Sequence, residues 1–182
     1  MTKDLTRGTP WKLILQFALP IMAGNLLQQL YNTADTIIVG NFESQTALEA
    51  VGACASLTIL FTALAIGFSI GAGVLISQFF GAGRLDELRR YASSAIVLML
   101  LMGLLMSAVG LASAQLLLGS FLGTPASLLA LSTLYFRIYA AGLVFQFGYN
   151  IVAALLRALG DSKATLYFLL VSSVMNVILD LL

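Results

Sequence analysis

Five long apolar runs, separated by short polar stretches, organise the chain. Each run reaches the roughly 20 residues that a helix needs to cross the hydrocarbon core of a bilayer. The stretches between the runs contain glycine, proline or charged residues, which are typical of turns between helices. The pattern therefore predicts an all-α membrane protein, built as a polytopic bundle of transmembrane helices. The expected helices are residues 11–39, 51–80, 92–118, 131–159 and 163–182.

A short arm precedes the first expected helix. Residues 1–10 are polar and basic. The apolar run that follows is longer than the hydrophobic region of a signal peptide and shows no small-residue cleavage site. We interpret residues 1–10 as an N-terminal arm and residues 11–182 as one membrane domain with a retained first helix.

Basic residues occur in the arm and then in every second polar stretch. The arm region has three, the stretch before the third helix has three and the stretch before the fifth helix has two, whereas the other two stretches have none. Cytoplasmic loops are enriched in Lys and Arg, so the alternation predicts a cytoplasmic N-terminus in a multi-pass protein of the inner or plasma membrane. Those eight residues are Lys3, Arg7, Lys12, Arg84, Arg89, Arg90, Arg157 and Lys163, and the ninth basic residue, Arg137, lies inside the fourth expected helix.

The composition agrees with a membrane protein and limits the kinds of partner that the chain could bind. The chain has 182 residues, of which 60% are hydrophobic and 9% charged, whereas a soluble domain carries about 25% charged residues. A net charge of +1 gives no field that would recruit nucleic acid. With no His and one Cys, the chain lacks the usual metal ligands. We therefore expect the lipid bilayer as a partner, and neither nucleic acid, a cofactor nor a metal other than a transported Na⁺.

A polar stripe follows the first expected helix. Its members are three or four residues apart, so most of them lie on one side of the helix. Polar groups without partners are costly in lipid, so the stripe is expected to face other helices or a water-filled cavity. Hydrogen bonding between helices remains an alternative to a cavity. The stripe consists of Asn25, Gln28, Gln29, Asn32, Asp35 and Thr36, of which Gln28 and Asn32 are candidate cavity-lining residues.

Two acids lie within the apolar runs, Asp35 on the first helix and Asp180 on the fifth. An ionised Asp at mid-membrane costs roughly 2.5–3.5 kcal/mol, and such residues commonly mark ion pathways. Measured from Lys12 and Lys163, the acids lie about 35 Å and about 25 Å along their helices, in the outer half of the membrane. Asn176 lies one turn before Asp180, and its side-chain oxygen could join the two carboxylates as a ligand. This set is suited to H⁺ or Na⁺, although Asp35 reaching the outer interface is an alternative.

The fourth expected helix carries a second group of polar residues. Gln146, Tyr149 and Asn150 lie in one helical sector, where Gln146 and Tyr149 are candidates to line a cavity and Asn150 to supply an oxygen to the ion. On the first helix, Pro20 removes a backbone hydrogen bond and is a candidate hinge.

Glycines are frequent on the second expected helix. Gly67, Gly71 and Gly73 leave little side chain on it. Small residues of this kind let membrane helices approach closely, so we expect this helix to pack tightly against its neighbours.

Four segments together resemble a known family. They occur in order along almost the whole chain, and they resemble segments of the bacterial branch of the MATE (multidrug and toxic compound extrusion) family. The segments are "ALPIMAGNLLQQLYNTADTIIVG", "AIGFSIGAGVLISQFFGAG", "LLRALGDSKAT" and "NVILDLL".

The resemblance implies a fold and a function. Family members are secondary antiporters with two six-helix lobes, and they export cationic or amphipathic drugs in exchange for H⁺ or Na⁺. In bacterial members the N-terminal lobe carries an ion site, and the matching positions here are Asp35, Asn150, Asn176 and Asp180. The family's cytoplasmic R-x-x-G-D turn matches the stretch from Arg157 to Asp161.

The length of the chain departs from the family. A full member is more than twice as long, so this chain is expected to hold five helices of a six-helix N-terminal lobe, with the C-terminal lobe as its missing partner. Because alternating access needs both lobes, we expect no transport by this chain alone.

Three other functions stay open. One is a lipid-linked sugar flippase of the same superfamily, which would need more basic residues facing its lumen. A second is a non-transporting membrane assembly subunit. A third is an intramembrane enzyme with the two acids as a dyad, although no substrate-cleaving motif surrounds either acid.

Overall fold

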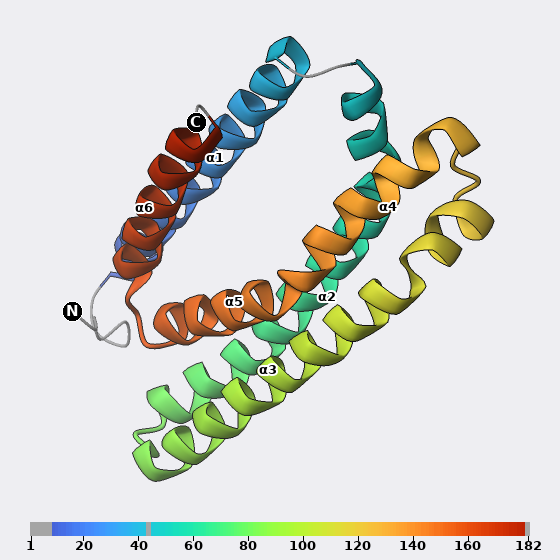
Figure 1. Cartoon of the computed structure of the whole chain (residues 1–182). Helices are drawn as coiled ribbons and strands as arrows, with labels where there is room; N and C mark the ends of the chain where they lie inside the picture. The colour runs from blue at the N-terminus through green and yellow to red at the C-terminus, as the bar shows by residue number, and fades with distance from the viewer. Residues whose placement is uncertain (1–8, 43–44, 181–182) are drawn as a thin grey trace.

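The described chain is helical almost throughout. A computed structural model describes the backbone of residues 9–42 and 45–180, and the side chains of residues 31, 32, 34–42, 177, 179 and 180 lie outside that description. The described part contains no strand, which confirms the all-α prediction. In chain order the elements are α1 (Pro10–Phe42), α2 (Gln45–Gly81), α3 (Leu85–Leu116), the π-helical turn η1 (Leu117–Phe121), α4 (Ala126–Ala141), α5 (Leu143–Ala158) and α6 (Ser162–Asp180) (Figure 1).

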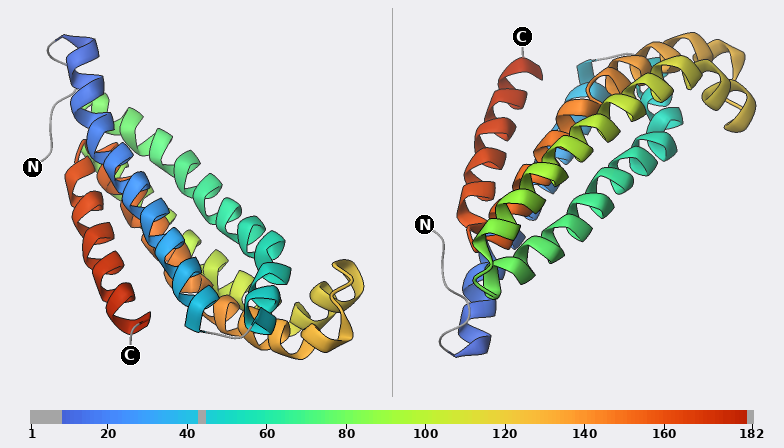
Figure 2. Two further views of the ribbon diagram at one scale, coloured as in Figure 1. Left: turned by 90° about the horizontal axis from the view of Figure 1, so that it is seen from above. Right: turned by 90° about the horizontal axis from the view of Figure 1, so that it is seen from below.

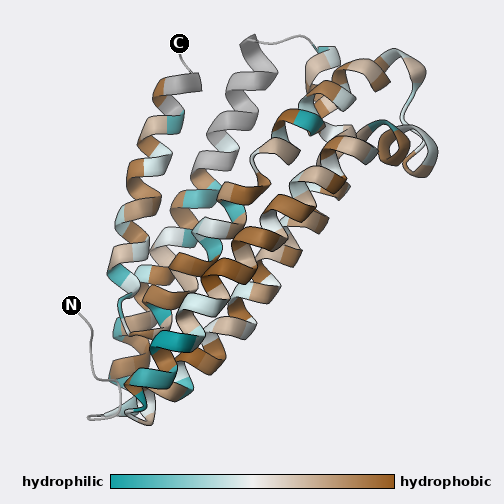
Figure 3. Cartoon of the chain, turned by 60° about the horizontal axis from the view of Figure 1, so that its bottom comes forward, coloured by the Kyte–Doolittle hydropathy of each residue, from teal (hydrophilic) through white to brown (hydrophobic). Residues whose placement is uncertain are grey.

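Several of these helices have the length and composition of membrane spans. Among the described residues, three helices could cross a membrane, and the pair α4–α5 makes a fourth if it counts as one span. Figure 3 shows hydrophobic residues along the helices and hydrophilic residues gathered towards one end of the bundle. The chain is a multi-pass membrane protein.

The fourth span differs from the single helix predicted for residues 131–159. The helical segment begins earlier, at Ala126, and is broken at Gly142, where α4 and α5 meet at an angle of 43°. The Gly142 N–H bonds the Tyr139 carbonyl at 3.0 Å, three residues back, so the regular α-helical spacing is interrupted there. The apolar pattern runs on through this point, which is why the sequence indicates one helix.

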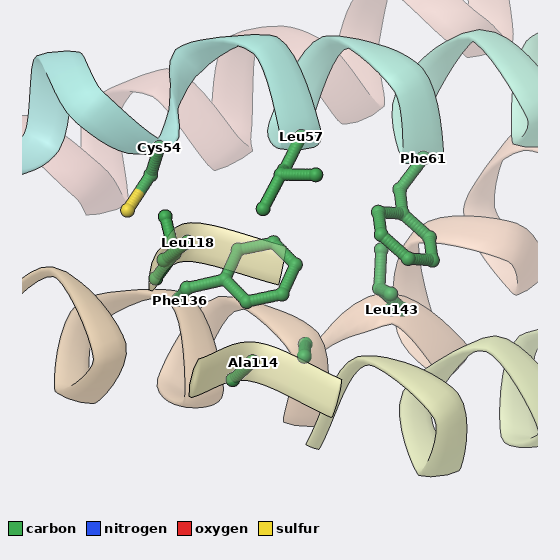
Figure 4. Packing of buried hydrophobic residues seen from close by; sticks show 8 residues of the cluster. Cys54, Leu57, Phe61, Ala114, Leu118, Phe136 and Leu143 are labelled. Atoms are coloured by element: carbon green, nitrogen blue, oxygen red, sulfur yellow. The ribbon is translucent and has the colours of Figure 1, made fainter. Parts of the chain in front are cut away.

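Two hydrophobic clusters hold α2–α5 together. The first joins α2, α3, η1 and α4 with Leu143 at the start of α5, and its residues interdigitate in Figure 4. The second joins α2, α3 and α5, with Phe147 and Ile151 fully buried. The first cluster consists of Cys54, Leu57, Phe61, Ala114, Leu118, Phe136, Ala140 and Leu143.

The remaining helices, α1 and α6, pack mainly against each other. Figure 1 shows them side by side and running in the same direction, while α2, α3 and the bent α4–α5 form a separate group. Figure 2, seen from above, also shows α1 and α6 running in the same direction. Helix α1 therefore meets α6 directly, although they are the most distant helices in the sequence.

The closest helix approaches lie on α3 rather than on the glycine-rich α2. A Cβ at Gly103 would lie 2.9 Å from Val144 Cα, and one at Gly110 would lie 2.8 Å from Ala140 Cβ. Of the three glycines singled out on α2, only Gly73 packs against another helix, whereas a Cβ at Gly67 or Gly71 would meet no described atom within 4 Å. Among the described glycines, those that lie closest to another helix are thus on α3.

Candidate functional site

A ring of three side chains joins α2 to both halves of the fourth span. Gln146 on α5 donates through Nε2 to the Thr62 hydroxyl on α2 at 3.0 Å. The hydroxyls of Thr62 and Tyr139 lie 2.9 Å apart, and the Tyr139 hydroxyl donates to Gln146 Oε1 at 3.1 Å. The three groups are half-buried. They form a closed, uncharged circuit of hydrogen bonds.

The backbone of α2 shares in this circuit. The Tyr139 hydroxyl also lies 3.1 Å from the Thr58 carbonyl oxygen, so its proton is shared between two acceptors. The Thr58 hydroxyl bonds within its own helix, to the Ala55 carbonyl at 2.9 Å. Thr58 therefore contributes its carbonyl to the circuit, and Thr62 contributes its side chain.

Sequence reasoning identified Gln146 but missed Thr62 and Tyr139. The sequence signal for them is weak: Tyr139 and Gln146 are seven residues apart, but a threonine in a membrane helix, such as Thr62, commonly bonds within its own helix. In the structure, the Gln146 amide is engaged in the ring. Tyr149, the other cavity-lining candidate on this helix, has 42% of its surface exposed.

Asn150 lies one turn beyond Gln146 and bonds back to it. Its Nδ2 donates to the Gln146 carbonyl at 2.8 Å. The Asn150 amide nitrogen is therefore used within α5, whereas no described residue bonds the Asn150 Oδ1. An amide carbonyl oxygen is a ligand suited to a hard cation such as Na⁺.

Asn176 on α6 also has an unpaired carbonyl oxygen. Its Oδ1 is buried, and no described residue gives it a hydrogen bond. A buried acceptor without a donor is costly, so this oxygen is a candidate cation ligand. Asn150 and Asn176 each lie within 15 residues of the turn at Asp161, on the two helices that this turn joins.

The register of α1 and α6 sets the height of the two acids. A Cβ at Gly24 would lie 3.4 Å from Leu169 Cδ2, so these two residues face each other across the helix pair. Asp35 follows Gly24 by eleven residues, and Asp180 follows Leu169 by eleven residues. Since the helices run in the same direction, both backbone positions lie about 16 Å beyond that contact. The side chains of Asp35 and Asp180 lie outside the described residues.

The other candidates on α1 are placed as follows. Gln28 is exposed, and the Asn32 side chain lies outside the described residues. Pro20 is half-buried within α1, which continues as one helix from Pro10 to Phe42. Among the residues whose side chains are described, no group of three or more His, Cys, Asp or Glu could hold a metal ion.

The turn between α5 and α6 explains its R-x-x-G-D sequence. Gly160 has a φ of +83°, a left-handed conformation that glycine adopts without strain. The Asp161 N–H bonds the Leu156 carbonyl at 2.8 Å, which closes α5 in a Schellman motif. Asp161 Oδ1 accepts the Ala164 N–H at 3.1 Å and so caps α6. That backbone N–H is the main reason why the pKa of Asp161 is lowered.

The family of the chain follows from comparison with known proteins. The family profile described as MatE matches residues 20–182. The chain belongs to the MATE family. The resemblance noted from the sequence segments is thereby confirmed.

Two curated relatives illustrate the similarity of this MATE chain to known proteins. It is 32% identical over 176 residues to the probable multidrug resistance protein YpnP of Bacillus subtilis, covering 97% of the chain and 39% of that protein. It is 28% identical over 179 residues to the probable multidrug resistance protein YoeA of the same organism, covering 98% of the chain and 38% of that protein. The chain thus spans about two fifths of the length of these relatives.

A solved structure shows the same arrangement of helices. The MATE chain matches the outward-facing conformation of a multidrug resistance MATE family transporter of the MOP superfamily, with a TM-score of 0.91 and 28% identity. The match covers 99% of this chain and 40% of that one. The curated relatives are named as probable multidrug resistance proteins and the solved structure as a transporter, so the MATE chain is not an enzyme, and the protease-like alternative loses its support.

Proposed function

We propose that this chain forms the N-terminal part of a secondary active antiporter that exports cationic or amphipathic drugs in exchange for H⁺ or Na⁺. The proposal draws on family membership and on the names of the relatives, which are multidrug resistance proteins. The observation that carries it is the register of α1 and α6, which brings the backbone positions of two intramembrane acids, Asp35 and Asp180, to a similar height.

The proposed ion site uses oxygen ligands from three helices. Asp35 and Asp180 supply carboxylates, Asn176 supplies the carbonyl oxygen that is buried without a described partner, and Asn150 supplies the carbonyl oxygen left by its bond to Gln146. Desolvation favours the neutral form of a carboxyl group, so it retains a proton until a pathway to water opens. A Na⁺ ion would compete with that proton for the same oxygens.

Binding and release at this site would move the drug by changing helix packing. We propose that protonation or Na⁺ binding at the two acids alters how α1 lies on α6, with Pro20 as the point at which α1 bends. Proline removes one backbone hydrogen bond from a helix and so lowers the resistance to bending there. Gln28, Asn32 and Tyr149 would line the cavity that the drug occupies.

Transport requires the rest of the protein in this proposal. The chain covers about 39% of YpnP, and alternating access moves one repeat against another. The partners would therefore be a C-terminal lobe, the small-molecule drug and the bilayer. A flippase for lipid-linked sugars fits less well, because the basic residues of α4 and α5 are an exposed Arg137 and a half-buried Arg157 in the last turn of α5.

Ethidium efflux from drug-sensitive bacteria tests the function. The longest reading frame that contains the chain is expressed as wild type, as Asp35→Asn and as Asp180→Asn, with Asp161→Asn as a control at a carboxylate outside the spans. Both intramembrane variants should lose ion-driven efflux while reaching the membrane in normal amounts, and the control should keep it. Wild-type efflux by Asp35→Asn and Asp180→Asn would exclude the two acids from coupling.

Labelling in intact cells tests the proposed orientation. Single cysteines are introduced into a Cys54→Ala background as Thr124→Cys or Asp86→Cys. Thr124 lies between η1 and α4, and Asp86 lies in the first turn of α3. With the N-terminus in the cytoplasm, a membrane-impermeant maleimide should label position 124 in intact cells and position 86 only after permeabilisation. The reverse result would invert the topology.

A further inference from the structure

The fourth span is braced on two sides at the point where it breaks. On one side lies α3, whose Gly103 contacts α5 at Val144 and Phe147 and whose Gly110 contacts α4 at Ala140. These glycines are two turns apart, so a single helix supports the span both before and after Gly142. On the other side lies α2, which meets the span through the Thr62–Tyr139–Gln146 ring.

The two braces differ in chemistry. The α3 contact is a close fit of glycines against backbone and Cβ atoms. Such van der Waals contacts depend on distance and do not require particular bond angles. The ring is directional, because each hydrogen bond requires a narrow range of distances and angles. Its bond from Tyr139 to Gln146 connects a residue of α4 with a residue of α5, three positions before and four positions after Gly142. The ring therefore ties the two halves of the span to each other directly, whereas the α3 contacts hold each half separately.

The backbone at the break does not fix the angle by itself. The Gly142 N–H bonds Tyr139 at 3.0 Å and the Phe145 N–H bonds Gly142 at 3.1 Å, which are short-range bonds within a tight turn. Glycine at this position has a wide range of accessible backbone angles. A bend built in this way stays in one geometry only while side chains hold it.

We propose that the ring of Thr62, Tyr139 and Gln146 is a latch that holds the fourth span bent at Gly142 and so sets the position of α5 against α2. Asn150 bonds the Gln146 backbone carbonyl within α5, so its amide moves together with α5. When the latch opens, the freed hydroxyl and amide groups must find other partners in a low-dielectric environment, and α5 moves relative to α4. The tests of the latch measure the bend itself and do not require the proposed ion site or transport to be correct.

Hydrogen exchange at the backbone amides of the bend tests the latch. Thr62→Val removes the ring hydroxyl with little change in volume, and Thr58→Val, one turn away, removes only a bond within α2. Tyr139→Phe removes the phenolic hydroxyl, and Tyr167→Phe makes the same change at an exposed tyrosine of α6. The full chain in lipid nanodiscs is used for each variant.

The two ring variants should exchange about three- to thirtyfold faster than wild type in peptides covering residues 138–148, as expected for a lost hydrogen bond between membrane helices. Peptides from α3 should be unchanged, and both control variants should match wild type. Ring variants that behave like the controls would overturn the latch. An equal increase across all of α2–α5 would also overturn it, since the ring would then be a general stabiliser.

A distance measurement covers the case in which one ring variant does not fold. Gln146→Asn shortens the amide by one methylene and takes it out of reach of Thr62. Spin labels at the exposed positions Ile70 on α2 and Val152 on α5, in a Cys54→Ala background, report the position of α5. The distance distribution should shift or broaden in Gln146→Asn, and an unchanged distribution in a folded variant would contradict the latch.

Discussion

Gly24 on α1 faces Leu169 on α6, with 3.4 Å between the Cβ position of the glycine and Leu169 Cδ2. This contact sets the register of two helices that are more than a hundred residues apart in the sequence. It also fixes the heights of Asp35 and Asp180, which both follow it by eleven residues.

A large side chain at Gly24 should separate these helices. Gly24→Ala adds a methyl group at ordinary contact distance and should be tolerated, whereas Gly24→Leu should cost about 1–3 kcal/mol of stability, as expected for overpacking. Thermal unfolding in detergent measures both variants. If Gly24→Leu were as stable as Gly24→Ala, α1 and α6 would not be packed at this point.

The close contact between α3 and α4 makes a second prediction. A Cβ at Gly110 would lie 2.8 Å from Ala140 Cβ, so Gly110→Ala should cost about 1–3 kcal/mol. Gly71→Ala is a matched control, because open space surrounds that position on α2, and it should be neutral or slightly stabilising. The same unfolding measurement compares the two. Equal effects would mean that α3 and α4 are not in close contact at Gly110.

The cap at Asp161 should give a dependence of stability on pH. Its pKa is lowered in the folded chain, mainly by the Ala164 N–H, so its ionised form stabilises α6 above the unfolded pKa. That contribution is fully present near neutral pH and is lost as the pH falls through the lowered pKa. Asp161→Ala should lose about 0.5–2 kcal/mol at pH 7, nearer the lower figure because the carboxylate is solvated.

Asp161→Asn separates the charge from the cap. The asparagine retains an acceptor for the Ala164 N–H, so most of the stability should remain, while the acid-dependent part disappears. Unfolding curves at neutral pH and at a pH below 4 would show this. An unchanged pH dependence in Asp161→Asn would assign the effect to another carboxylate.

Much of the fold could be predicted from the apolar pattern, because burial in lipid demands long uninterrupted helices. The break at Gly142 could not, since glycine is frequent in membrane helices and the apolar pattern continues on both sides. The tight packing at Gly103 and Gly110 was also missed. A glycine's role depends on which helix faces it, and the sequence does not show that Gly110 has a close neighbour while Gly71 faces open space.

The candidate site was predictable only in part. Asp35, Asn176 and Asp180 stand out because polar groups are rare in such runs, and the family segments include them. Thr62 and Tyr139 do not stand out, because a threonine can satisfy its hydroxyl within its own helix, as Thr58 does. Their ring appears only when α2 is laid against the two halves of the fourth span.

Disulfide cross-linking of Asp35→Cys with Asp180→Cys, in a Cys54→Ala background of the longest reading frame, is the most direct test of a shared ion site on α1 and α6. Gly24→Cys with Leu169→Cys is the positive control, since these positions are in contact, and Asp35→Cys with Ser173→Cys is the negative control, about 10 Å out of register. The account predicts rapid cross-linking for 35 with 180 and for the positive control, and little for 35 with 173. Cross-linking of 24 with 169 but not of 35 with 180 would contradict it.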